Sequence, residues 1–176
     1  MIPGIVIAIL TFPGVIVHEA AHMLFCRLRR VAIFDACFFR FGNPVGYVVH
    51  ENAKDFTTMF LIAVGPFIVN SLLCMVICLP VIAPTQLFGR FDPLSYVLLW
   101  IGLSIGMHAF PSTQDARVLW SAARTGAKRG SPLAIVSFPL VVAIYIANIL
   151  SFFWFDYIYG YAIGLGLPKY ILEHIS

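Results

Sequence analysis

The sequence predicts an all-α polytopic membrane protein with roughly four or five membrane helices. A small β-hairpin or sheet is expected between the first and the second helix. Three observations favour this fold: 61% of the 176 residues are hydrophobic, 11% are charged, and the mean hydropathy is +0.94. Soluble globular proteins carry about 25% charged residues. Because all polar connections are short, residues 1–176 are predicted to form a single integral-membrane domain.

The first predicted helix covers about residues 2–28. At about 1.5 Å per residue it is long enough to cross a hydrocarbon core of about 30 Å. Pro13 and Gly14 are expected to kink it or open it locally. The amino end has neither a charged region nor a small-residue cleavage site, which favours a retained membrane helix over a removable signal.

The motif His18-Glu19-Ala-Ala-His22 lies inside this apolar helix. Residues four apart share a helix face, so both imidazoles can reach one metal ion. Zinc held by two imidazoles and one more protein ligand keeps a position open for water and lowers the pKa of that water toward about 7. Glu19 would take its proton. A chance match is the alternative, but two histidines and a glutamate are costly in hydrocarbon unless they have partners, which favours a metal site.

Residues 31–51 are rich in β-branched and aromatic residues around a turn cluster at residues 41–46. They predict a hairpin with strands at 31–40 and 45–50. An exposed strand edge can accept an extended peptide. The segment 42–51 is therefore a candidate for holding the substrate strand, through Gly46, Tyr47 and His50. A plain connecting hairpin is an equally good interpretation of the same pattern.

The second predicted helix covers about residues 56–83 and contains Gly65, Pro66 and Asn70. The proline leaves a backbone group for neighbouring helices to satisfy, the glycine allows a close helix approach, and the asparagine offers a buried amide. A packing role is the simplest interpretation of all three. A sharper alternative makes Asn70 a hydrogen-bonding partner near the metal.

A third helix is predicted at about residues 94–110, followed by a polar segment that contains His108 and Asp115. Asp115 is the natural third zinc ligand. It can also be read as a helix N-cap after Pro111. His108 is either a rival metal ligand or a residue that donates a hydrogen bond to one of the metal ligands.

The remaining chain predicts an amphipathic helix at residues 116–129, suited to the bilayer interface or serving as a solvated connector. The apolar stretch 131–167 is too long for one simple span. It is either one span with an interfacial or re-entrant piece near residues 152–161, or two short spans separated near Asp156.

Basic residues indicate the orientation in the membrane. If the first three spans exist, the loop after the first helix and the segment after the third face the same side. By the positive-inside rule this side is cytoplasmic, and the predicted site lies toward it. That side holds nine of the eleven basic residues: Arg27, Arg29, Arg30, Arg40, Lys54, Arg117, Arg124, Lys128 and Arg129.

Three motifs in this order resemble those of the site-2 protease family of intramembrane zinc metalloproteases. The first, His18 to His22, matches the HExxH motif of that family, and residues 65–70 look like its GPxxN element. The segment from His108 to Asp115 is similar to the third motif, in which an Asn, a Pro and a ligand Asp precede a Gly. Here His108 replaces that Asn at an altered spacing, and Ala116 follows the Asp. The resemblance extends over about residues 12–119.

The resemblance implies one zinc ion per chain, bound by His18, His22 and Asp115, with Glu19 as general base and Asn70 near the site. The predicted function is a zinc endopeptidase that cleaves a transmembrane protein or peptide substrate within membrane lipid; no nucleic-acid partner is predicted. A zinc-binding but inactive adaptor or assembly factor is one alternative, against which the intact Glu19 argues. A zinc-dependent membrane hydrolase of a lipid or small amide is the other.

Overall fold

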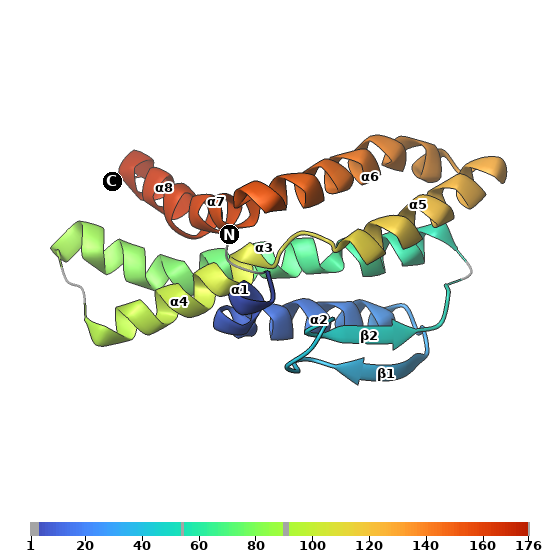
Figure 1. Cartoon of the computed structure of the whole chain (residues 1–176). Coiled ribbons are helices and arrows are strands. Elements are labelled where there is room, and N and C mark those ends of the chain that lie inside the picture. Colours follow the sequence, from blue (N-terminus) through green and yellow to red (C-terminus); the bar gives the residue numbers. More distant parts are fainter. Residues whose placement is uncertain (1–3, 54, 90–91, 176) are drawn as a thin grey trace.

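The computed structural model of the chain describes residues 4–53, 55–89 and 92–175. Most of this part is helical, and its one sheet is a small antiparallel pair of strands between the first and second predicted helices (Figure 1). The predicted combination of helices with a small β element is therefore confirmed. Lys54 and Arg90, which contributed to the charge count, lie outside the described residues.

The predicted first helix consists of two helices, α1 (Gly4–Leu10) and α2 (Phe12–Leu28), which meet at an angle of 88°. The expected kink near Pro13 is confirmed, and it divides the segment into two helices. Pro13 occupies the first turn of α2, where its missing N–H costs nothing. Inside one continuous helix the same ring would clash with the preceding turn, which explains why a new helix starts at Phe12.

Strand β1 (Ile33–Cys37) pairs with β2 (Tyr47–His50), with Cys37 opposite Tyr47 and Ile33 opposite His50. Both strands are shorter than predicted. The residues between them form a loop in which the Arg40 side chain donates to the Pro44 carbonyl at 2.9 Å. In Figure 1 the hairpin folds back along α2, with β2 beside the helix and β1 outside it.

Helix α3 (Phe56–Phe88) runs through the middle of the molecule and packs against most other helices (Figure 1). On one side lie α2 and α4 (Pro93–Met107). A Cβ atom at Gly65 would collide with the Phe25 ring of α2, so this glycine permits the close approach of α2 and α3, as predicted.

Helices α5 (Thr113–Lys128) and α6 (Pro132–Leu150) form an antiparallel pair against α3. Helix α5 is amphipathic, as predicted, but its apolar face packs on α3 and α6. In this structure that face is therefore covered by protein. The core between the three helices is made of Phe56, Ala63, Ala116, Leu119, Ala123, Ala134, Val141 and Ile144.

The end of the chain continues as a short 3-10 helix, Ser151–Phe153, followed by α7 (Phe155–Tyr161), a π-helical turn, Ala162–Gly166, and α8 (Leu167–Ile175). Trp154 has a φ of +66°, and this left-handed residue separates α6 and its 3-10 extension from α7. Segment 155–175 then packs against α3 and α4. Of the two predictions for residues 131–167, the structure agrees with one long apolar helix followed by a separate piece.

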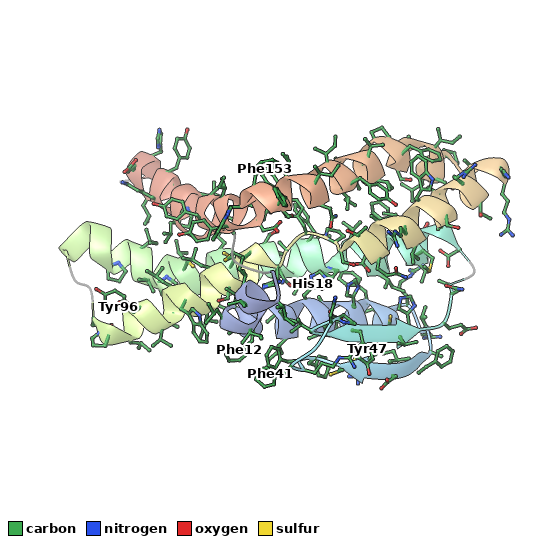
Figure 2. All side chains as sticks on the ribbon, viewed as in Figure 1. Phe12, His18, Phe41, Tyr47, Tyr96 and Phe153 are labelled. Atoms are coloured by element: carbon green, nitrogen blue, oxygen red, sulfur yellow. The ribbon has the colours of Figure 1, made fainter. Side chains whose placement is uncertain are left out.

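Two helical segments, Phe56–Pro84 and Pro132–Phe153, are long and apolar enough to cross a membrane, and α1 with α2 would add a third if the bent pair is one span. Helix α4 is apolar but shorter. The predicted number of four or five membrane helices is thus not confirmed. Large apolar side chains such as Phe41 and Phe153 are exposed on the outside (Figure 2), which is compatible with an integral membrane protein.

Candidate metal centre

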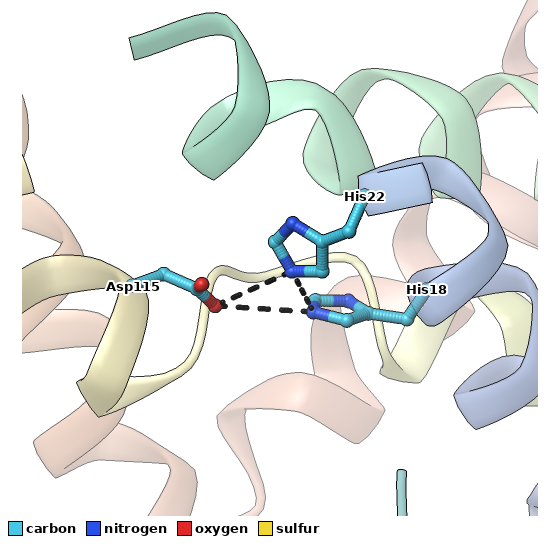
Figure 3. A group of neighbouring side chains, drawn as sticks. All are labelled: His18, His22 and Asp115. Atoms are coloured by element: carbon cyan, nitrogen blue, oxygen red, sulfur yellow. Dashed lines mark hydrogen bonds and ion pairs between the residues drawn. The ribbon is translucent and has the colours of Figure 1, made fainter. Parts of the chain in front are cut away.

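The structure brings together His18 and His22 of α2 and Asp115 in the first turn of α5 (Figure 3). The two Nε2 atoms are 3.1 Å apart. Oδ2 of Asp115 lies 3.5 Å from Nε2 of His22 and 4.0 Å from Nε2 of His18. Residues almost a hundred positions apart in the sequence thus point their ligand atoms at one spot.

Hydrogen bonds on the far side of each imidazole fix its tautomer. Nδ1 of His18 lies 2.7 Å from the carbonyl oxygen of His108, and Nδ1 of His22 lies 2.9 Å from that of Ile62. A carbonyl oxygen can only accept, so each Nδ1 carries the proton, and in a neutral ring Nε2 is left with a lone pair. Two imidazole nitrogens and a carboxylate oxygen then converge. A metal ion, or a proton shared between these atoms, would stabilise this arrangement.

The spacing of the three atoms fits zinc. Ligand atoms about 2.0–2.1 Å from a tetrahedral ion are about 3.3 Å from one another, and the observed separations are 3.1, 3.5 and 4.0 Å. Carbonyl groups that hold the outer nitrogens of ligand histidines are also typical of zinc sites. His18, His22 and Asp115 therefore have the donor chemistry and the spacing to hold a zinc ion.

Asp115 is oriented by the cap of its own helix. Ser112, not Asp115, is the N-cap of α5, so the predicted N-cap role of Asp115 is wrong. Asp115 sits three residues later and closes a capping box, in which its Oδ2 accepts from the Ser112 backbone N–H at 2.8 Å and from the hydroxyl at 2.6 Å. These two hydrogen bonds stabilise the ionised form of the Asp115 side chain, which is the form that binds a metal.

His108 supports the cluster through its backbone. Its imidazole Nε2 lies 2.8 Å from Oγ1 of Thr11, at the bend between α1 and α2, so the structure does not bring it to the ligand atoms. Its carbonyl oxygen accepts from His18 and also from the Asn70 amide at 2.9 Å. Asn70 is fully buried on α3 and donates to the Ile105 carbonyl as well. Asn70 and His18 therefore share a hydrogen-bond acceptor, the His108 carbonyl oxygen.

Two supporting residues were not found from the sequence. Ser112 is one, and Asn148 of α6 is the other: its amide donates to the Pro111 carbonyl at 3.0 Å, and its Oδ1 accepts from the Thr113 hydroxyl at 3.1 Å. Asn148 thereby fastens the start of α5 to α6. A lone amide inside the apolar stretch 131–167 was the available signal, because such groups in an apolar helix usually have a polar partner.

Glu19 and His18 line a cavity of about 250 Å³ beside the cluster, together with Gly46, the residue before β2. A Cβ atom at Gly46 would lie 2.8 Å from Cγ of Glu19, so only glycine lets the strand approach this side chain. The other two predicted strand residues lie apart from the cluster. Tyr47 donates to Asp35 of β1 at 2.8 Å, and His50 is at the far end of β2.

The three motifs recognised in the sequence therefore meet in the fold: the helix with both histidines, the buried Asn70 and the segment before Asp115. Comparisons with family models, curated proteins and solved structures give no match. What the residues themselves offer is a group of three side chains that could hold a metal ion and a further carboxyl group, Glu19, that shares a cavity with His18 and is outside that group. This combination suits the hydrolysis of a carbonyl compound by water.

Proposed function

We propose that this chain is an intramembrane zinc endopeptidase of the site-2 protease type, which hydrolyses peptide bonds in or next to membrane-spanning segments. The observation that carries the proposal is the convergence of two imidazole nitrogens and one carboxylate beside a cavity that Glu19 also lines. His18, His22 and Asp115 would hold one zinc ion per chain. When bound there, zinc supplies Lewis acidity, which polarises a carbonyl group and acidifies water.

Glu19 is the proposed general base. It follows ligand His18 directly on α2, so its carboxyl group reaches the same cavity while remaining outside the ligand set. A carboxylate in this position accepts a proton from the attacking water and returns it to the leaving amine, which lowers the barrier of both steps.

The peptide to be cleaved would enter in an extended conformation. In a helical substrate the carbonyl group is hydrogen-bonded and shielded, so the segment must unwind before water can attack. Strand β2 pairs with β1 alone in the two-stranded sheet, and Gly46, the residue before β2, adjoins Glu19. An unwound segment adding to the unpaired side of β2 would lie along the cavity.

We further propose that the site opens toward the cytoplasm. Arg29 and Arg30 follow α2, and Lys128 and Arg129 end α5, so basic residues gather where these helices end. In Figure 1 both ends lie on the same side of the molecule. Positive residues at helix ends are retained on the cytoplasmic side of membranes.

The substitution Glu19→Gln tests the function. The variant should keep its zinc, because glutamine replaces a residue outside the ligand set, but lose cleavage by about 10²–10⁴-fold, since no group takes the proton. Zinc is measured by elemental analysis and cleavage by mass spectrometry on a panel of single-span peptides. Glu173→Gln on α8, an exposed carboxylate paired only with Lys169, is the matched control and should behave as the wild type.

The same panel, extended to lipids, separates the alternatives. A zinc-loaded wild type that hydrolyses lipids and leaves peptides intact is a lipid hydrolase. One that binds peptides and hydrolyses neither is an adaptor. Full peptide cleavage by Glu19→Gln would overturn the assignment of the base.

A further inference from the structure

The cavity beside the metal cluster continues beyond it. A second cavity of about 320 Å³ runs between α1 and the beginning of α7. The two cavities share Ala8, Met107, His108, Ser151 and Asp156 in their walls. Asp156 therefore lies in the shared wall between the space around Glu19 and a second space that none of the proposed metal ligands lines.

Asp156 is incompletely paired. Its Oδ1 atom is buried and has no hydrogen-bond partner among the described residues, and the nearby Ser151 hydroxyl donates to the Ala147 carbonyl at 3.0 Å. A negative charge in the first turn of a helix interacts favourably with the helix dipole, and this explains why Asp is tolerated at the start of α7. It does not explain a buried oxygen without a partner, which is uncommon and costs stability in apolar surroundings.

The walls around Asp156 favour a cation. Trp154, Tyr157 and Phe152 line the second cavity, and aromatic faces attract Lys and Arg side chains. The charged residues in the walls of the two cavities, as far as the structure describes them, are the acids Glu19 and Asp156, with no Lys or Arg. A positively charged group in the second cavity would find the acidic Asp156, aromatic rings and, among the described residues, no Lys, no Arg and none of the proposed zinc ligands.

We propose that the junction of the two cavities is a subsite for a Lys or Arg side chain of the substrate, with Asp156 as the residue that determines this specificity. The inference rests on the proposed peptidase function. The space is sufficient, because at about 30 Å³ per water the cavities of about 250 and 320 Å³ have room for about eight and eleven waters. Membrane segments commonly carry lysine or arginine at their cytoplasmic ends, so natural substrates can supply the side chain.

A lysine scan tests the subsite without requiring hydrolysis. The full chain with Glu19→Gln is reconstituted, and its affinity is measured for single-span peptides in which one lysine is moved a residue at a time, each paired with a methionine peptide. In one register lysine should bind about tenfold more tightly than methionine, as expected for a charge-assisted hydrogen bond. Adding Asp156→Asn should abolish this difference, and adding Asp156→Glu should preserve it.

The control is Glu173→Gln in the same background, which removes an exposed carboxylate far from the cavities and should leave the lysine preference unchanged. A scan with no preferred register overturns the subsite even if no Asp156 variant folds. A preference for lysine over methionine that persists in the Asp156→Asn variant also overturns the subsite. Cleavage by the wild type with a flat scan rejects the subsite alone, whereas an Asp156-dependent scan with no cleavage by the wild type rejects the peptidase alone.

Discussion

The two parts of the metal cluster are built differently. His18 and His22 project from the interior of α2, and their outer nitrogens are held by carbonyl groups of two other segments, at His108 and Ile62. Asp115 instead comes from the first turn of a helix and is held by Ser112 of the same turn. Side-chain exposure follows this division: 12% for His18 and 8% for His22, against 20% for Asp115.

This difference concerns how each ligand is kept in place. The two histidines are separated by one helical turn, so their spacing is a property of α2 alone, and long-range packing only selects their tautomer. The position of Asp115 depends on where α4 ends and α5 begins. That break is determined by Pro111, by the Ser112 cap and by the contact of Asn148 with the link. We therefore expect the α2 part to be the more rigid and the α5 part the more adjustable.

Removing either histidine should have the largest effect. His18→Ala or His22→Ala deletes a ligand that no other described side chain is placed to replace. Zinc affinity should fall by more than roughly 10–100-fold, which is the loss typical when a residue that hydrogen-bonds to a metal ligand is removed. The measurement is competition with a chromophoric chelator on detergent-purified protein. Stoichiometric zinc in both variants would mean that α2 does not provide the main ligands.

A smaller effect is expected from Asp115→Ala, which should weaken zinc binding by about a hundredfold because the two imidazoles remain. His108→Ala should cost less than about tenfold, since alanine keeps the carbonyl group that accepts from His18. Both variants are measured by the same competition. If His108→Ala lost the metal and Asp115→Ala kept it, the third ligand would be a histidine and the division between the two parts would be wrong.

Local sequence patterns predicted what depends on neighbouring residues. The i, i+4 histidine pair, the turn cluster that makes the hairpin and the apolar helices needed only spacing and composition. A kink near Pro13 and Gly14 was predicted from the residue types, but its 88° angle was not, because tertiary contacts such as the close approach of Gly14 to Ser104 and His108 are not visible in the sequence. Helix α5 was assigned to the bilayer interface or to a solvated connector, since its amphipathic pattern does not show that α3 and α6 cover its apolar face.

Local sequence patterns also left part of the site undetermined. Asp115 was chosen as third ligand from residue type and a family resemblance, while the choice between it and His108 depended on which way each side chain turns after α4 ends. Spacing alone does not contain that information. The carbonyl groups that accept from the two histidines could not be predicted from the sequence either. Every residue has a carbonyl group, and only the tertiary fold determines which one faces an imidazole. Asp156 had a sequence signal, a charge in an apolar run, but no visible partner.

The smallest expected effect concerns the support of Asp115. Ser112→Ala removes the hydroxyl that bonds Oδ2 of Asp115 at 2.6 Å, but the backbone N–H of residue 112 still donates to the same oxygen. Loss of an N-cap hydroxyl costs about 1 kcal/mol of unfolding free energy, and zinc affinity should fall by less than about tenfold. Ser112→Thr keeps a hydroxyl and should restore both quantities, as measured by denaturant unfolding of the metal-free protein and by chelator competition. A loss of zinc as complete as that of His22→Ala would show that the α5 part is as rigidly constructed as the α2 part.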